Sequence, residues 1–309
     1  MTLREEARQA LHVYQSQTGL SLLEISNRTG YAYHSVRQFS SGGRYGVGEG
    51  EYTAKALMDF FAANPPARPV VVGTFYETEC TRAIDRLLAY VAGGRNGMLY
   101  GPAGAQKSET LKRRALAAWG DAEPWCVYVE CSPRMTPLAL LRRVAAVIGA
   151  PYSQYQEGMI QAVQATLRRR RTPAVLMIDE AQKLCRAIDT FEMVRDIGDK
   201  AQGKAGILIA GNEGVFDLFK PRPGMYMEQW KSRIERKRVR VLGLSEAEAR
   251  EIVRAELGTL KPESVQTLLG KPVLDPETEK TYISARRLFN AIDDYRELRA
   301  KGNGTGKAN

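Results

Sequence analysis

The pattern of apolar and polar positions divides the chain into three parts. Up to about residue 63, apolar residues recur at helical spacing. Between about 70 and 242, helical patterns alternate with short continuous apolar runs, which predict parallel strands buried on both faces. From Leu244 onward the pattern is helical again. The apolar runs that predict strands are 97–100, 125–130, 173–180 and 206–213.

The first sixty residues predict a helix-turn-helix. Ser21 and Glu24 have the spacing of a capping box, and Gly30 suits a tight turn that needs a positive φ. The next helix, 32–39, would enter the major groove of DNA. The alternative is a small helical domain that binds protein. The candidate DNA contacts are Tyr33, His34, Arg37 and Gln38 on this helix and Arg44 in the glycine-rich loop after it.

The proline-rich segment 64–69 predicts a linker, because prolines prevent continuation of the helix and stiffen the connection. We therefore expect an all-α helix-turn-helix domain over 1–64 and an α/β core over 65–242. A small helical lid should occupy 243–300. The Gly/Asn/Lys-rich tail, 301–309, should be disordered.

Residues 99–108 place a strand, a turn of small residues, a Lys-Ser pair and a helix in the order that a phosphate-binding loop requires. Backbone N–H groups would surround the phosphates, Lys107 would reach the outer phosphates, and Ser108 would hold Mg²⁺. Gln106 stands where the pattern has its last glycine, and a left-handed backbone there costs about 1–2 kcal/mol. If the missing glycine limits phosphate contact, Gln106→Gly should raise nucleotide affinity. The candidate nucleotide contacts are Gly101, Pro102, Ala103, Gly104, Ala105, Gln106, Lys107, Ser108 and Glu109.

The apolar run 173–180 ends in two acidic residues. Asp179 would hold Mg²⁺ through water, and Glu180 would polarise the water that attacks the nucleotide. The alternative is a buried strand that ends in a solvated acidic turn. Together with the Lys-Ser loop, this run predicts a protein that binds ATP with Mg²⁺ and hydrolyses it.

Three other polar segments allow two interpretations each. Asn212 follows a predicted strand and could bond a γ-phosphate or the attacking water, or could belong to an ordinary turn. The basic segment 230–240 could act at a neighbouring subunit or form a solvated helix face before an edge strand. Arginines 168–171 could face DNA or a partner, or favour the negative end of a helix dipole.

The net charge of +10 and pI near 9.4 favour a polyanionic partner such as nucleic acid. No apolar run approaches the roughly 20 residues that cross a bilayer, and the N-terminus is polar. We therefore expect no membrane association and a cytoplasmic location in a bacterial or phage-infected cell. The four cysteines lack C-x-x-C spacing and the two histidines lie far from them, so a zinc site is not expected.

These motifs together resemble those of the AAA+ ATPases. The resemblance lies in the phosphate-binding loop, Ile-Asp-Glu-Ala-Gln at 178–182, the segments 208–213 and 232–234, and Arg286 in a small helical lid. The Asp-Glu-Ala-Gln and Gly-Asn-Glu signatures are similar to those of the transposition regulators, which include the phage Mu B protein, TnsC and IstB. A helix-turn-helix before the core is the phage Mu B arrangement. Helicase loaders and replication initiators have a similar AAA+ core and are the alternative.

The resemblance implies roles for several residues. Asn212 would sense the γ-phosphate, Arg233 (with Arg236 as the alternative) would reach the nucleotide of an adjacent subunit, and Arg286 would be the sensor arginine of the lid. Arg134 would face DNA, because insertions after the second strand do so in related ATPases.

The resemblance also implies an activity. ATP would drive assembly of a homo-oligomer, a helical filament or ring, on double-stranded DNA. The assembly would mark target DNA and activate a transposase. Weak hydrolysis, stimulated by DNA or a partner, would drive disassembly. A nucleotide switch with little hydrolysis is a third hypothesis, since Gln106 departs from the family pattern.

Overall fold

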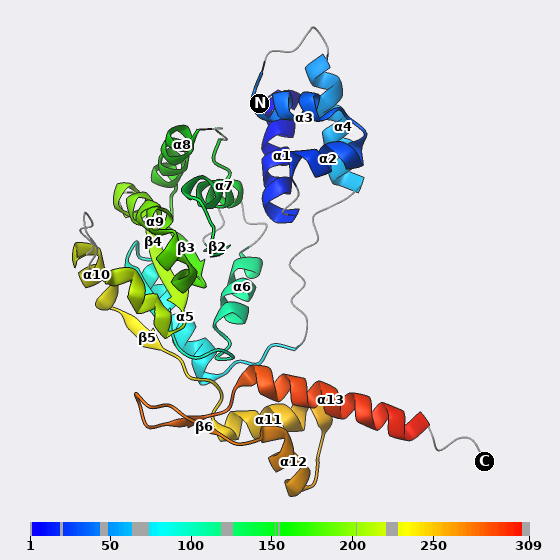
Figure 1. Ribbon diagram of the computed structural model, residues 1–309, viewed down its shortest axis with the longest axis vertical. Coiled ribbons are helices and arrows are strands. Elements are labelled where there is room, and N and C mark those ends of the chain that lie inside the picture. The colour runs from blue at the N-terminus through cyan, green and yellow to red at the C-terminus, as the bar shows by residue number, and fades with distance from the viewer. Residues whose placement is uncertain are drawn as a thin grey trace.

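The computed structural model describes residues 2–18, 21–43, 49–63, 74–118, 126–151, 153, 155–201, 203–220 and 228–304. Figure 1 shows an N-terminal helical domain in blue, an α/β core, and a lid in orange and red. The predicted linker and Arg44 lie outside the described residues. Within the described part of the chain, no helix has the length and apolar character that a bilayer span requires.

Four helices form the N-terminal helical domain around a small core that includes Leu11, Ile25 and Phe39. The predicted capping box is present: Ser21 Oγ accepts a hydrogen bond from the Glu24 N–H, and Glu24 Oε2 accepts one from the Ser21 N–H. Gly30 ends the second helix with φ +73°. The helices are α1 (Leu3–Thr18), α2 (Leu22–Thr29), α3 (Tyr33–Ser40) and α4 (Glu49–Ala63).

The core contains a sheet of five parallel strands in the order β2-β3-β4-β1-β5. Each predicted apolar run forms a strand, and the basic segment before residue 240 ends in a short edge strand. The order places the strand before the phosphate-binding loop between β4 and β5. The strands are β1 (Asn96–Tyr100), β2 (Cys126–Glu130), β3 (Ala174–Asp179), β4 (Ala205–Gly211) and β5 (Arg238–Arg240).

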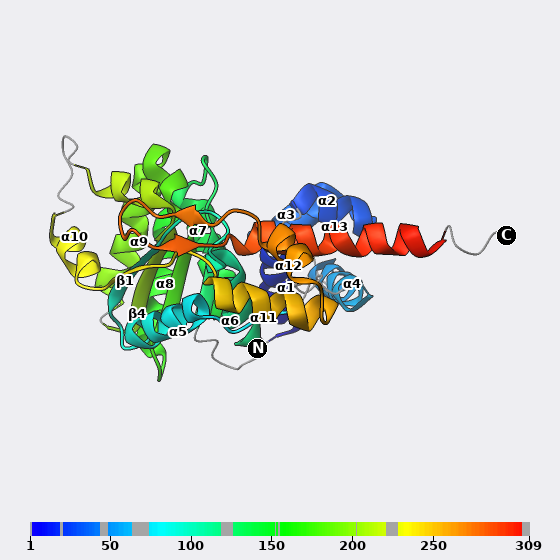
Figure 2. The ribbon, with the colours of Figure 1, turned by 90° about the horizontal axis from the view of Figure 1, so that it is seen from below.

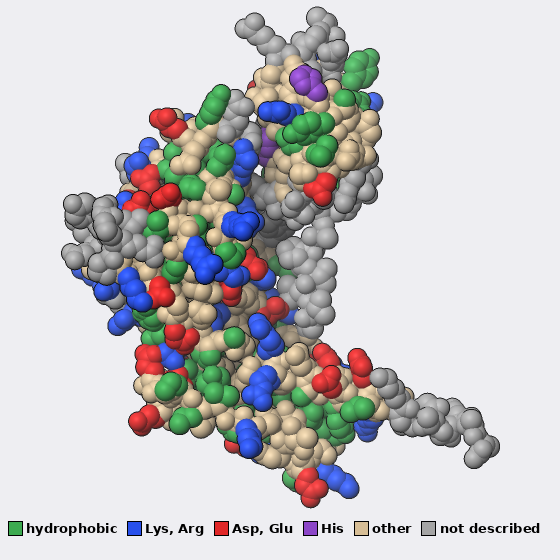
Figure 3. Space-filling model, in the orientation of Figure 1, with side chains coloured by type: hydrophobic (Ala, Val, Ile, Leu, Met, Phe, Trp, Pro, Cys, Tyr) green, Lys and Arg blue, Asp and Glu red, His purple; other side chains and the backbone are tan. Residues whose placement is uncertain are grey.

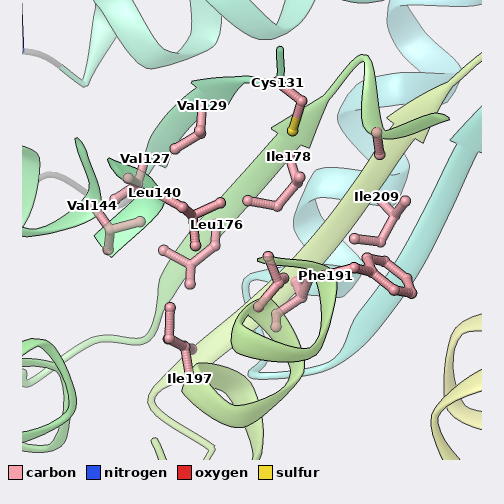
Figure 4. Close-up of a cluster of buried hydrophobic side chains, with 14 of the residues drawn as sticks. Val127, Val129, Cys131, Leu140, Val144, Leu176, Ile178, Phe191, Ile197 and Ile209 are labelled. Carbon is pink, nitrogen blue, oxygen red and sulfur yellow. The ribbon is translucent and has the colours of Figure 1, made fainter. Parts of the chain in front are cut away.

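Helices cover both faces of this sheet. Along β3, Val175 and Met177 point to one face, while Leu176 and Ile178 point to the other, as the period of two in a strand requires. Figure 4 shows the apolar cluster on the face to which Leu176 and Ile178 point. There, side chains of β2, β3 and β4 meet Phe191 and other helical residues. On the first face lie α5 (Glu79–Val91) and α6 (Lys107–Ala117); on the second lie α7 (Pro137–Ile148), α8 (Gln156–Arg169), α9 (Ile188–Lys200) and α10 (Glu228–Glu235).

The lid has its own apolar cluster. Its helices are α11 (Glu246–Leu257), α12 (Pro262–Leu269) and α13 (Ala285–Gly304), with an unpredicted antiparallel hairpin of β6 (Val273–Leu274) and β7 (Thr281–Tyr282). A capping box of Ser245 and Glu248 begins α11. The expectation of a disordered tail is wrong for residues 301–304, because α13 continues through them; residues 305–309 lie outside the described part.

The N-terminal helical domain meets the core through α1 and α7, which lie side by side in Figure 1. The lid meets the core at the end of the sheet that carries the phosphate-binding loop. In the turned view of Figure 2, α13 projects away from the core beyond the other lid helices.

Candidate nucleotide-binding site

The loop between β1 and α6 depends on two glycines. Gly101 has φ +148°, and a Cβ there would lie 1.8 Å from the Val241 carbonyl oxygen. Gly104 has φ +85°, and a Cβ there would lie 2.2 Å from Ser284 Oγ. Both positions therefore need glycine for their backbone conformation and for the close approach of another segment.

Gln106 adopts the left-handed conformation that the missing glycine would have taken, with φ 60° and ψ 9°. Its Oε1 accepts a hydrogen bond of 3.0 Å from Thr78 Oγ1, at the start of α5. Such a bond contributes about 0.5–1.5 kcal/mol, which offsets part of the left-handed cost of about 1–2 kcal/mol. The loop thus keeps its conformation with a side chain at this position.

Lys107, the first residue of α6, is buried and donates hydrogen bonds to the carbonyl oxygens of Gly101 at 2.7 Å and Pro102 at 2.8 Å. Burial lowers the pKa of Lys107, and the negative charges of Asp179 and other carboxylates oppose that shift. The ammonium group therefore lies within electrostatic reach of the acidic end of β3. Glu109 forms an ion pair with Arg113 at 2.7 Å.

Asp179, the last residue of β3, is 1% exposed, and both its carboxylate oxygens accept hydrogen bonds. The Glu180 N–H donates to Oδ1 at 2.9 Å, and the Tyr128 hydroxyl donates to Oδ2 at 2.8 Å. Glu180 has φ 55° and begins the 3₁₀ segment η1 (Ala181–Arg186). Gln182 Nε2 donates to Glu180 Oε2 at 3.0 Å, and Lys183 Nζ lies 3.2 Å from the same oxygen.

The donor set at this edge fits Mg²⁺. The Ser108 hydroxyl and the Asp179 carboxylate supply the hard oxygen ligands that Mg²⁺ prefers, together with waters and substrate phosphates. Both residues lie at the carboxyl end of parallel strands or at the start of the following helix. Ser108 and Asp179 would hold the ion, and Mg²⁺ would neutralise charge on the phosphates.

Asn212 follows β4 and caps the 3₁₀ segment η2 (Glu213–Phe219), because its Oδ1 accepts a hydrogen bond from the Gly214 N–H at 2.9 Å. The side-chain carbonyl of Asn212 therefore belongs to a turn, as one of the two interpretations predicts. The amide half remains a donor at an exposed position. Since β4 pairs with β1, Asn212 lies beside the phosphate-binding loop.

Arg286 is the second residue of α13 and is exposed. The preceding N–H, of Ala285, donates to the Gly104 carbonyl oxygen at 3.0 Å. The Arg286 Cβ lies 3.4 Å from where a Cβ on Gly104 would stand. The structure thus brings the first turn of α13 directly onto the loop.

Arg233 and Arg236 lie near the amino ends of the strands, whereas the phosphate-binding loop lies at the carboxyl ends. Arg233, in α10, pairs with Asp199 at 2.6 Å, and Arg236 is exposed just before β5. Because β5 runs parallel to β1, these residues are separated from the loop of their own chain by the length of a five-residue strand, about 16 Å. They are not part of the site that the loop forms within one chain.

The candidate DNA contacts lie on separate parts of the molecule. Tyr33, His34 and Arg37 are exposed on α3, while Gln38 is half-buried. Arg134 is exposed in the turn between β2 and α7.

An ion-pair cluster that the sequence pattern did not indicate joins the lid to the core. Arg240, at the end of β5, pairs with Asp275 and Glu277 of the lid hairpin and lies 3.4 Å from Glu213. Its guanidinium also lies over the Tyr100 ring at 5.5 Å. The cluster connects the hairpin to the segment that follows Asn212.

Comparison with known proteins supports the architecture. Residues 91–219 match a family model described as an AAA domain. No curated protein matches the chain. The chain is similar to Cdc6p from Pyrobaculum aerophilum (18% identity, TM-score 0.53), over 76% of this chain and 66% of that protein. It is also similar to the Aeropyrum pernix Orc1 protein, solved in complex with DNA (18% identity, TM-score 0.52), over 75% and 64% respectively.

The chain spans slightly less than two thirds of the length of each of these two proteins. The narrower resemblance to the transposition regulators is not confirmed by any of these matches. The match to an AAA domain, the parallel sheet and the covering helices agree with the predicted fold class. The chain therefore has the α/β P-loop fold of AAA+ proteins.

Proposed function

We propose that this chain binds ATP with Mg²⁺, hydrolyses it, and assembles on DNA in an ATP-dependent manner. The observation that carries the proposal is the meeting of three segments at one edge of the sheet: the loop before α6, the acidic end of β3, and the first turn of α13. Lys107 would contact the outer phosphates, and Glu180 would polarise the attacking water. Arg286 would contact the nucleotide from the lid.

The distribution of charge supports nucleic acid as the partner. Residues 1–63 hold six Lys and Arg against six Asp and Glu, and residues 243–309 hold eleven of each. The whole surplus of +10 therefore belongs to the core, and Figure 3 shows Lys and Arg side chains over the visible face of the core. Phosphate contacts by the core would make DNA binding independent of sequence and sensitive to salt.

One group of these charges lies where strands begin, and we call it the amino-edge row. Loops before β1 and β4 touch, since a Cβ on Gly94 would lie 2.2 Å from the Gly203 carbonyl oxygen. Four neighbouring strands, about 4.8 Å apart, make the row about 15 Å wide. Its members are Arg95 before β1, Arg171 before β3, Lys204 before β4, and Arg236 and Lys237 before β5.

An aromatic ring lies within the amino-edge row. Arg95 and Lys237 both lie over the Tyr90 ring, at 5.0 and 5.6 Å from its centroid. One member of the row also bonds within the chain: Lys204 Nζ donates to the Arg171 carbonyl oxygen at 3.3 Å. Cations beside an aromatic ring suit a nucleic-acid backbone and bases.

Assembly would place the nucleotide between subunits. Arg233 or Arg236 lies too far from the loop of its own chain to contact that nucleotide, so either would act on the nucleotide of a neighbour. ATP would then stabilise the assembly, and hydrolysis would release it.

Between the two biological roles, we favour the replication-initiator or helicase-loader type. Similarity to Cdc6p and to an Orc1 protein in complex with DNA supports this type. Activation of a transposase is the second candidate, favoured by the α2–α3 helix-turn-helix before the core and by the Gly-Asn-Glu segment at 211–213.

The test of the ATPase is a comparison of the wild-type chain with Glu180→Gln. We expect both to bind ATP with similar affinity, while the variant loses hydrolysis by a factor of 100 or more. Absence of ATP binding by the wild-type chain would contradict the proposal.

Electron microscopy on duplex DNA with ATP and with ADP tests assembly. Larger species that form only with ATP support the proposal. Binding to a replicative helicase together with a preference for single strands would establish the loader type. Stimulation of a transposase would establish the second candidate instead.

A further inference from the structure

Tyr128 contacts the acidic end of β3 from the neighbouring strand. In the register of the sheet, Glu130 of β2 lies opposite Asp179 of β3, and Tyr128 lies two residues earlier on the same face. From there its hydroxyl reaches Asp179 Oδ2 at 2.8 Å. An ionised carboxylate can only accept a hydrogen bond, so the Tyr128 hydroxyl is the donor in this contact.

A competing acceptor lies nearby, but it is farther away and shares its charge with a lysine. The Tyr128 hydroxyl is 3.5 Å from Glu130 Oε2, a longer distance than to Asp179. Lys112 of α6 pairs with that same Glu130 oxygen at 2.9 Å. A hydroxyl has a single proton to donate. The ion pair of Lys112 with Glu130 therefore favours donation to Asp179.

Together with the backbone, this hydroxyl fixes the orientation of the carboxylate. The Glu180 N–H occupies one lone pair of Asp179 Oδ1 at 2.9 Å, and the Tyr128 hydroxyl occupies one lone pair of Oδ2. Each carboxylate oxygen has about two lone-pair sites. One site on each oxygen thus remains for the water shell of a metal ion.

We propose that Tyr128 is a positioning residue of the Mg²⁺ site: its hydroxyl holds the Asp179 carboxylate in the orientation that binds the hydrated ion. This inference rests on the proposed function, because it concerns the same site. Outer-shell partners of metal ligands have effects of about 10–100-fold on metal affinity when removed. Tyr128 touches neither the nucleotide nor the attacking water in this account.

The test is Tyr128→Phe, which removes the hydroxyl and keeps the ring. Binding of a fluorescent ATP analogue is measured against Mg²⁺ concentration, and Mn²⁺ binding to the nucleotide-bound protein is measured by electron paramagnetic resonance. We expect the metal dissociation constant to rise about tenfold. Nucleotide affinity in the presence of EDTA should not change, since the hydroxyl acts only through the ligand of the metal.

The matched control is Tyr76→Phe, which removes a similar bond, 2.7 Å from a tyrosine hydroxyl to Glu256 of the lid. This variant should keep the wild-type metal constant. A second variant, Lys112→Met, keeps Tyr128 but frees Glu130 to compete for its proton. It should raise the metal constant by a smaller factor than Tyr128→Phe, and it serves where the Phe variant unfolds.

The inference would be overturned if Tyr128→Phe and Lys112→Met both had the same metal dissociation constant as the wild-type chain. An equal loss of nucleotide affinity with and without metal would also overturn it, because that pattern indicates a general packing defect. A wild-type chain that binds no nucleotide in EDTA or in Mg²⁺ would instead contradict the proposed function itself.

Discussion

Gln106 Oε1 accepts a hydrogen bond of 3.0 Å from Thr78 Oγ1, which anchors the left-handed residue of the phosphate-binding loop to the start of α5. The side chain therefore has a partner within the fold. A glycine at this position would relieve backbone cost but lose that partner.

We predict that Gln106→Gly changes ATP affinity by less than about threefold, because the two effects are each about 1 kcal/mol and opposite in sign. The measurements are a nucleotide titration and thermal unfolding. Gln106→Met is the matched control: it keeps the left-handed cost, lacks the acceptor, and should be the less stable variant. A tenfold gain in affinity for Gln106→Gly would mean that the side chain limits phosphate contact.

Gly104→Ala should weaken ATP binding by at least tenfold. The added Cβ would meet Ser284 Oγ at 2.2 Å, in a residue with φ +85°, and would push the start of α13 off the loop. The double variant with Ser284→Ala should recover part of the affinity. Full recovery would show that backbone strain contributes nothing, and no recovery would show that the clash with Ser284 is irrelevant.

Arg233 should act on a neighbouring subunit, since it lies at the edge of the sheet away from its own loop. We expect Arg233→Ala and Lys107→Ala each to lose most of the hydrolysis rate, and a mixture of the two to recover part of it. In mixed assemblies some sites combine an intact loop with an intact arginine. Asp199→Asn removes the partner that Arg233 has at 2.6 Å and should keep the rate within about twofold of wild type. If mixing recovers nothing, Arg233 does not act between subunits.

The amino-edge row should account for a measurable part of the salt dependence of DNA binding. Replacing both Arg95 and Lys237 with glutamine should make the slope of log affinity against log salt shallower by about 0.9 for each lost phosphate contact. The matched control replaces the exposed lid residues Lys261 and Lys271 with glutamine, which lowers the net charge by the same amount. Equal slopes for the two double variants would exclude the row as the contact surface.

His12 should make the stability of the N-terminal helical domain depend on pH. Burial lowers the pKa of His12 to about 4 from 6.5, with Arg8 and Arg142 acting in the same direction and the Ser40 backbone opposing. Between those two values the unfolded state binds more protons than the folded state. Stability is therefore complete above about pH 6.5 and decreases as the pH falls toward 4, by at most about 3 kcal/mol.

Unfolding of wild type and His12→Gln at several pH values between 4 and 7 tests this prediction. Glutamine does not titrate, so the difference in stability between the two proteins should diminish as the pH falls. A constant difference across this range would contradict the pKa shift.

Sequence reasoning found the elements whose signals are local. The apolar runs that became β3 and β4 and the capping boxes at Ser21 and Ser245 depend only on neighbouring residues, and each is present. Helix α5 begins at Glu79, because Thr78 is the N-cap and its hydroxyl accepts from the Thr81 N–H. Strands of two residues, such as β6 and β7, are too short to show a period.

Contacts between distant segments could not be predicted. The bond of Tyr128 to Asp179 depends on the register of β2 against β3, and that of Ala285 to Gly104 depends on where the lid lies. The charge cluster of Arg240 likewise joins β5 to a hairpin that the pattern does not reveal. Residue types identified the candidate chemistry, and tertiary packing determined which residues support it.

The attachment of α13 to the phosphate-binding loop has a mechanical consequence. The helix begins with a hydrogen bond from Ala285 to Gly104 and continues for 20 residues, a length of about 30 Å. A rigid rod of that length acts as a lever whose pivot is the loop itself. A rotation of about 10° at the pivot would displace the far end by about 5 Å, so a small rearrangement around the phosphates would be amplified at the remote tip of the lid.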